Sequence, residues 1–174
     1  MELRQRKKNR LQGYDYSRSG CYFITICTNK RAEFFWDFAA MRSVGADIIR
    51  PHSPILSQYG CFAERAIQNI SRNYVSVAVD KYVVMPNHVH FILSLSQSQM
   101  QKSGRMISAP TKAIPTIVGQ MKRIVSKEVG FPIWQKGYHD HIIRNEADYR
   151  RIWEYIDTNP AKWREDCYYE DGVE

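Results

Sequence analysis

Alternation of apolar and polar residues predicts four β-strands in this chain. A period of two is typical of strands that bury one face. The stretches are rich in β-branched and aromatic residues and span 21–28, 75–85, 88–95 and 133–144. The alternation is interrupted near Asp80 and Lys81, and Pro86-Asn87 predicts a turn between the second and third strands.

Apolar residues recur every three or four positions in two other segments, 56–72 and 114–129, which predicts amphipathic helices. A third helix is predicted to begin at Asn145, a good N-cap, and to stop at Pro160. Residues 94–110 are rich in Ser, Gln and Lys without a period, so we expect a loop there. Between 29 and 54 the pattern is unclear, and residues 33–38 fit a short strand or an apolar loop.

The order of these elements predicts an α+β fold of the ferredoxin-like, split βαβ type. In this fold two helices cover one face of a four-stranded antiparallel sheet. The other face is free to bind a ligand, and the extra C-terminal helix could pack there. We expect a basic N-terminal arm over residues 1–19, one domain over 20–164 and an acidic tail over 165–174.

The net charge of +7 and the pI near 9.3 favour a polyanionic partner. Aromatic residues make up 13% of the chain, which favours nucleic acid over a merely soluble basic protein. The candidate DNA-binding residues are Arg4, Arg6, Lys7, Lys8, Arg10, Arg144 and Arg151. A solvated tail explains the basic arm equally well.

The four cysteines are scattered without metal-binding spacing, which predicts reduced thiols. No apolar run reaches the 18 or so residues of a membrane span, and no signal-peptide pattern opens the chain. We therefore expect a cytoplasmic protein that is nucleoid-associated when bound to DNA.

His88 and His90 are two apart on a predicted strand, so their imidazoles share one face. Such a pair is either half of a metal site or simply two polar residues on a solvated face. On the third helix, Tyr155 and Asn159 are four apart and share a face. An amide oxygen beside two imidazoles suits Mg²⁺ or Mn²⁺ with open positions for phosphate oxygens.

The segment from Val83 to Leu93 resembles the HUH segment of the single-tyrosine transposases. The segments Trp134–Asn145 and Tyr149–Pro160 resemble the C-terminal block of the REP-associated tyrosine transposase branch. Residues 9–16 and 20–28 are similar to that branch too, so the resemblance covers roughly residues 9 to 164.

The resemblance implies a ferredoxin-like enzyme that cleaves and joins single-stranded DNA near imperfect hairpins. It implies that His88 and His90 bind the metal ion and that Asn159 is the third ligand, where insertion-sequence relatives often carry glutamine. Tyr155 is then the nucleophile that forms a 5′-phosphotyrosine intermediate.

Several alternatives stay open. His139 and His141 form a second His-x-His, for which structural or DNA-contacting roles are favoured over a second metal centre, and Tyr138 is the rival nucleophile. The chain could instead be a non-catalytic module that binds single-stranded nucleic acid. A nucleotide hydrolase with three alternating histidines is disfavoured because Ile92 occupies the third position. Monomer and homodimer are both open, as is the choice between the two metal ions.

Overall fold

The computed structural model describes residues 14–15, 18–43, 54–74, 76–96 and 113–169. Its strands are β1 (Gly20–Cys27), β2 (Val77–Val84), β3 (His88–Leu95) and β4 (His139–Ile143). Its α-helices are α1 (Phe38–Ser43), α2 (Gln58–Gln68), α3 (Ile70–Asn73), α4 (Ala113–Val129) and α5 (Glu146–Thr158). Two 3-10 turns, η1 (Asn29–Arg31) and η4 (Asn159–Glu165), follow β1 and α5.

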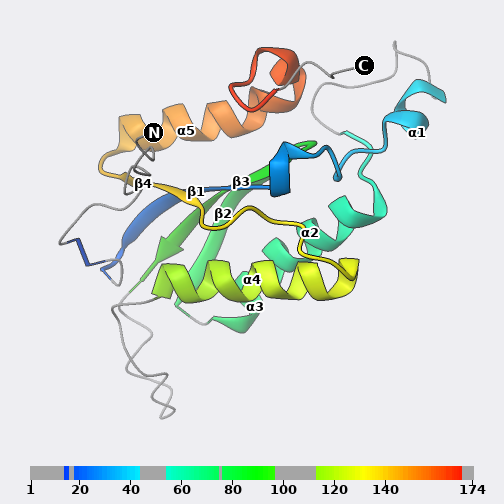
Figure 1. Cartoon of the computed structure of the whole chain (residues 1–174). Helices are drawn as coiled ribbons and strands as arrows, with labels where there is room; N and C mark the ends of the chain where they lie inside the picture. Colours follow the sequence, from blue (N-terminus) through cyan, green and yellow to red (C-terminus); the bar gives the residue numbers. More distant parts are fainter. Residues whose placement is uncertain (1–13, 16–17, 44–53, 75, 97–112, 170–174) are drawn as a thin grey trace, which may run out of the picture.

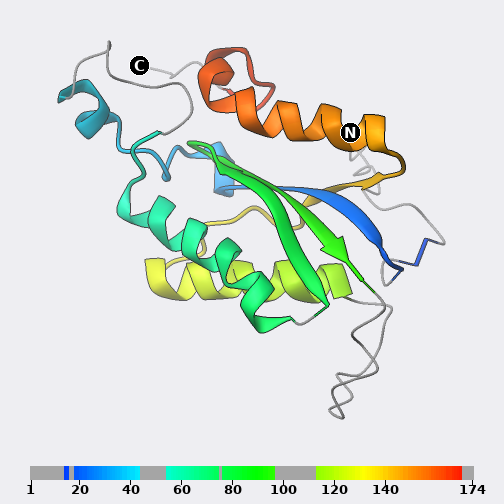
Figure 2. The same cartoon turned by 180° about the vertical axis from the view of Figure 1, so that it is seen from behind.

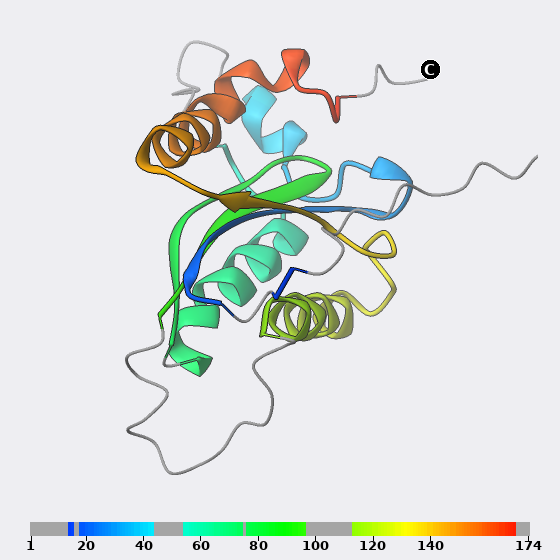
Figure 3. The ribbon, with the colours of Figure 1, turned by 90° about the vertical axis from the view of Figure 1, so that its left-hand side faces the viewer.

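The four strands form one antiparallel sheet in the order β2-β3-β1-β4. Helices α2 and α4 lie on one face of this sheet, and α5 lies on the other (Figures 1 and 2). The edge-on view shows the sheet between these two helical layers (Figure 3). The predicted ferredoxin-like arrangement is therefore confirmed, including the extra helix on the second face. No helix in the described part of the chain has the length and apolar character needed to cross a membrane.

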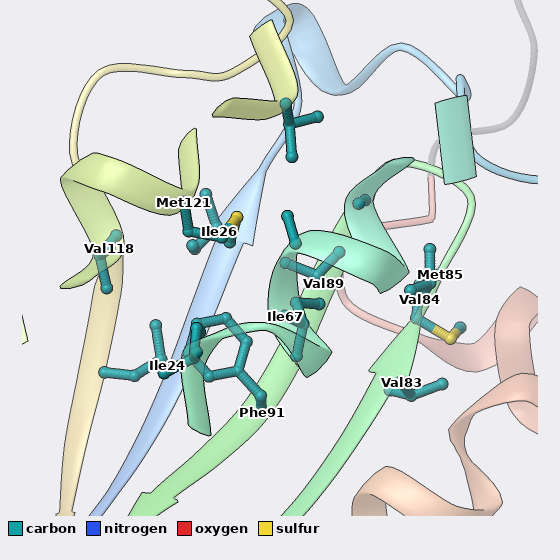
Figure 4. Close-up of a cluster of buried hydrophobic side chains, with 14 of the residues drawn as sticks. Ile24, Ile26, Ile67, Val83, Val84, Met85, Val89, Phe91, Val118 and Met121 are labelled. Atoms are coloured by element: carbon teal, nitrogen blue, oxygen red, sulfur yellow. The ribbon is translucent and has the colours of Figure 1, made fainter. Parts of the chain in front are cut away.

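The main hydrophobic core lies between the sheet and helices α2 and α4. Ile24, Ile26, Val89 and Phe91 are fully buried and point toward Ile67 of α2 and toward α4 (Figure 4). These strand residues alternate with others that point to α5, as the period of a strand requires. Residue parity along β1 and β3 therefore decides which layer each side chain enters.

A β-bulge in β2 explains the interrupted alternation near Asp80 and Lys81. Val79 pairs with Leu93 and Lys81 with the adjacent Ile92, so Asp80 is an extra residue. Both charged side chains then project toward α5. The Tyr149 hydroxyl donates to Asp80 at 3.1 Å, and Lys81 forms an ion pair of 2.5 Å with Asp157.

Three predicted elements differ from those observed. The strand predicted over 133–144 forms only over His139–Ile143, because Gly137 turns with φ of 88° and Lys122 binds the carbonyls of Gln135 and Gly137. The helix predicted over 56–72 is divided in the structure into α2, which ends at Gln68, and the separate short helix α3, which begins at Ile70. The third helix ends at Thr158, yet the chain does not stop turning there, because η4 continues it with Pro160 in its first turn.

The segment after β1, where the sequence pattern was unclear, packs onto the core without joining the sheet. Phe35 and Trp36 are buried, and the Trp36 indole donates to the carbonyl of Val84 at 2.7 Å. Gly60 of α2 lies so close to the carbonyl of Phe35 that a Cβ there would collide with backbone. An apolar loop, one of the two alternatives for residues 33–38, is what this part of the chain forms.

Candidate active site

The two histidines of β3 lie on the face of the sheet that α5 covers, and both are buried. Thr25 pairs with His90, and its Oγ1 lies 2.8 Å from His90 Nδ1. Asn87 Oδ1 lies 2.8 Å from His88 Nδ1. These contacts engage Nδ1 of each ring, and the two Nε2 atoms face each other 2.9 Å apart. The pair therefore presents both Nε2 atoms to one point.

Burial keeps both imidazoles neutral. The pKa of His88 falls to about 3, because the ring is withdrawn from water and the Arg31 guanidinium repels a second positive charge. The pKa of His90 lies well below 6.5, chiefly through burial and then through repulsion from His88. Neutral imidazole is the form that binds a metal ion, so neither ring has to lose a proton at pH 7.

Helix α5 begins at its N-cap Asn145, whose Oδ1 accepts a hydrogen bond of 2.9 Å from the backbone N–H of Asp148. Ile152 and Ile156 are buried and hold one stripe of the helix against the molecule. The N-cap and this apolar stripe fix where the next residues of the helix lie.

Tyr155 lies between the sheet histidines and solvent. Its hydroxyl is 3.2 Å from His90 Nε2, and its ring meets the rings of His90 and Phe23 at centroid distances of 5.2 and 6.1 Å. The side chain is 37% exposed, so the hydroxyl is within reach of a substrate. The structure thus brings together the tyrosine and the histidine pair that the sequence singled out.

Asn159 is buried at the junction of α5 and η4. Its Nδ2 donates to Asp166 Oδ2 at 2.7 Å. Its Oδ1 is buried and finds no hydrogen-bond partner among the described residues. A buried acceptor without a donor is costly, which makes Oδ1 a fitting ligand atom for a cation.

Asp166 is a site residue that sequence reasoning missed. Its Oδ2 accepts hydrogen bonds from the Tyr155 hydroxyl at 3.0 Å and from Asn159, while its Oδ1 accepts one from the backbone N–H of Tyr168. The ligand atoms of His88, His90 and Asp166 lie within 4.8 Å of one another, the only such group found in the described ranges.

The first residues of the predicted acidic tail pack against the sheet. The ring of Tyr168 lies 4.6 Å from that of His88, and Trp163 is buried beside it. The signal that could have revealed this is the presence of Tyr168 and Tyr169 in the segment, because a solvated tail has little use for aromatic side chains.

Tyr155 is protonated at neutral pH. Burial raises its pKa above the ordinary value of 10, and the Asp166 carboxylate raises it further because it disfavours a second negative charge. Tyr155 and Asp166 line a groove of about 320 Å³ whose wall also carries the cations Arg151 and Lys162 and the carboxylates of Glu154 and Glu165. The phenol therefore faces an open groove of mixed charge and has a proton acceptor beside it.

The other predicted residues make their contacts elsewhere, although Arg151 also lines the groove of Tyr155. Arg144 is exposed, and Arg151 is exposed and paired with Asp148 at 2.7 Å. His141 is also bound to Asp148, at 2.7 Å, which is a structural contact at the start of α5. Tyr138 is partly buried against the core. The arm residues Arg4, Arg6, Lys7, Lys8 and Arg10 lie outside the described residues.

The chain is similar to known proteins in sequence and in structure. An uncharacterized protein of Haemophilus influenzae is 30% identical, over 97% of this chain and 96% of its own length. The REP-associated tyrosine transposase of Escherichia coli is 31% identical over 48% of this chain and 44% of its own length. No protein-family model matches the chain.

A solved structure described as a REP-associated tyrosine transposase bound to a REP hairpin has the same fold. The TM-score is 0.54 at 22% identity, with 94% of this chain and 74% of the other covered. The chain is therefore similar in sequence to REP-associated tyrosine transposases and shares the fold of one of them, which confirms the resemblance seen in the sequence.

Proposed function

We propose that this protein is a metal-dependent enzyme that cleaves and rejoins single-stranded DNA near imperfect hairpins through a covalent bond to Tyr155. The observation that carries the proposal is the convergence of two elements distant in sequence. The Tyr155 hydroxyl from α5 lies 3.2 Å from His90 Nε2, which itself lies 2.9 Å from His88 Nε2. The coordination of a metal ion and the attack of a nucleophile would thus occur at one place.

The residues present fit a divalent metal ion. His88 and His90 would supply Nε2, and the buried, unpartnered Oδ1 of Asn159 would supply an oxygen. The Asp166 carboxylate adds an anionic oxygen next to the histidines. Mixed nitrogen and oxygen ligands suit Mn²⁺, and Mg²⁺ when phosphate and water complete the shell. The bound ion would polarise the scissile phosphate and offset the charge that develops during attack.

The chain's own groups would carry the proton and the phosphoryl group. Tyr155 Oη attacks the phosphorus, and its proton passes to Asp166 Oδ2, which already accepts its hydrogen bond at 3.0 Å. The bond from phosphorus to the 3′-oxygen breaks, and that oxygen leaves as a 3′-hydroxyl after it takes up a proton. The DNA is then joined to Tyr155 through a 5′-phosphotyrosine ester, and a second 3′-hydroxyl reverses the steps without ATP.

Incubation with a single-stranded hairpin oligonucleotide and Mn²⁺ or Mg²⁺ tests this function. The expected product is a protein–DNA adduct that survives denaturing electrophoresis. EDTA and Tyr155→Phe should each abolish it. Tyr138→Phe is the matched control, because it removes the same hydroxyl from the rival tyrosine and should leave the adduct intact.

The alternative outcomes are distinct. An adduct that survives Tyr155→Phe and vanishes with Tyr138→Phe would show that Tyr138, and not Tyr155, is the nucleophile. Binding of the hairpin without an adduct under any metal condition would favour a non-catalytic nucleic-acid-binding module. Loss of the adduct with His88→Ala while DNA binding persists would support the metal role of the histidine pair.

A further inference from the structure

The turn that follows β1 has an unusual backbone. Lys30 and Arg31 of η1 both have φ of 54°, and they are the only non-glycine residues with positive φ in the described part of the chain. This left-handed region is unfavourable for residues with a Cβ, and two such residues in succession are rarer still. Strain of this kind persists only where the surroundings impose it, and it is concentrated at functional sites.

The surroundings of this turn do impose it. The backbone N–H of Asn29 donates to the carbonyl of Ile133 at 2.7 Å, which ties the turn to the segment before β4. The buried Thr28 hydroxyl lies 2.7 Å from the carbonyl of Ala32 and 3.0 Å from that of Asn87. Because Asn87 directly precedes His88, the turn is fixed relative to the histidine pair.

The fixed turn places a cation at the edge of the candidate metal site. The Arg31 guanidinium lies 5.4 Å from the centre of the Tyr168 ring, and that ring lies 4.6 Å from the ring of His88. Arg31 is also the charged group that helps to lower the pKa of His88. A positive charge that acts on His88 opposes the binding of a metal cation on its own.

A phosphate removes this conflict, because its negative charge attracts both cations. The face of a guanidinium stacks on an aromatic ring, whereas its N–H edges bind phosphate oxygens, so the two contacts are compatible. We propose that Arg31 binds a phosphodiester group of single-stranded DNA at the metal site and thereby makes DNA binding and metal binding reinforce each other. This inference rests on the proposed function and adds a residue to its substrate site.

The first test measures DNA affinity without cleavage, in the full chain carrying Tyr155→Phe. Fluorescence anisotropy with a labelled hairpin oligonucleotide and Mn²⁺ is recorded over a range of NaCl concentrations. Arg31→Gln is expected to weaken binding about tenfold and to reduce the slope of log affinity against log salt by about one, as loss of one phosphate contact does. Arg31→Lys should keep most of the slope and lose part of the affinity.

The second test measures Mn²⁺ binding by calorimetry in the absence of DNA. Here Arg31→Gln is expected to bind Mn²⁺ roughly threefold more tightly, because a repelling charge is gone. The two effects have opposite signs, and damage to the fold would instead weaken both. An unchanged salt slope, or weaker binding of Mn²⁺ alone, would overturn the inference.

Two glycine variants separate the charge from the strain. Lys30→Gly relieves one strained position and removes the neighbouring exposed charge, so DNA affinity should stay within about twofold of the parent. Arg31→Gly relieves strain too, yet it should lose as much DNA affinity as Arg31→Gln. Equal losses for Lys30→Gly and Arg31→Gln would mean that any charge on this turn suffices, and the inference would fail.

The inference and the proposed function fail separately. If the protein with native Tyr155 forms an adduct and Arg31→Gln leaves the salt slope unchanged, only the role of Arg31 is lost. If no adduct forms while Arg31 still accounts for one phosphate contact, the covalent chemistry is lost and the DNA site remains.

Discussion

The two faces of the sheet are built from the same strands and are both buried, but they are filled in different ways. Toward α2 and α4, the strands present Ile24, Ile26, Val89 and Phe91, all fully buried and apolar. Toward α5, the alternate positions present Thr25, His88, His90 and the ring of Phe23, which stacks on His90 at 5.1 Å. One face is a hydrophobic core, and the other combines a polar network with apolar contacts that include the buried Ile152 and Ile156 of the covering helix.

The difference indicates that the face toward α2 and α4 mainly provides stability, whereas the face toward α5 mainly provides the candidate active site. The core face gains free energy from apolar burial. The α5 face gains less, because withdrawing imidazoles from water is unfavourable, and the hydrogen bonds of His90 with Thr25 and of His88 with Asn87 only offset that loss. Substitutions on the first face should therefore change stability, and those on the second should change activity and its response to pH.

Neighbouring residues on β3 and β1 provide the largest contrast. Phe91→Ala is expected to lower the free energy of unfolding by about 3–5 kcal/mol, because it leaves a cavity in the core. Phe23→Ala, on the α5 face, should cost less than half as much, since its ring is partly exposed. It should nevertheless slow adduct formation more than any stability loss explains, because the ring contacts both His90 and Tyr155. Urea unfolding and adduct assays on both variants check this, and equal stability losses would erase the contrast.

The response of stability to acid, taken per pH unit, is the next largest effect. As the pH falls below about 6.5, His88 and His90 take up protons in the unfolded chain. In the folded protein they stay neutral to lower pH, because the pKa of His88 is about 3 and that of His90 is well below 6.5. Unfolding is therefore favoured, and stability should fall by up to about 1.4 kcal/mol per pH unit for each histidine in that window. Above pH 6.5 both states are neutral and the histidines add no slope.

Urea unfolding at several pH values measures this slope. The double variant His88→Gln, His90→Gln removes both titrating groups, so most of the slope between pH 6.5 and 4 should disappear with it. A slope that is unchanged in the double variant would show that other groups cause the acid sensitivity.

The smallest expected effect is the loss of stability when the N-cap is removed from either of two helices on opposite faces of the sheet. Ser57 Oγ accepts from the backbone N–H of Gly60 at 3.1 Å to begin α2, as Asn145 does for α5. Ser57→Ala and Asn145→Ala should each cost about 1 kcal/mol. Only Asn145→Ala should also slow adduct formation, because α5 carries Tyr155. Equal kinetics in the two variants would mean that the start of α5 does not control the position of Tyr155.

Periodic features of the fold could be predicted from the sequence, and contacts between distant segments could not. Alternation identified β1 and β3 and put His88 and His90 on one face, because a strand leaves no other choice. The pairing of Tyr155 with that face depended on the resemblance as well as on helix spacing. Asp166 was missed because its role comes from η4 folding back on α5, which no local pattern encodes. Arg31 was missed because a left-handed backbone has no reliable signal outside glycine and asparagine.

The single extra residue in β2 has a consequence for how such a protein can change. It directs both Asp80 and Lys81 toward α5. Asp80 there contacts Tyr149, which comes 69 residues later in the chain, and Lys81 contacts Asp157. Deleting Asp80 would restore a regular ladder in the sheet, yet it would remove a contact that positions α5 on the sheet. An irregularity in one strand thus helps to position a helix, and the proposed nucleophile on it, that come much later in the chain.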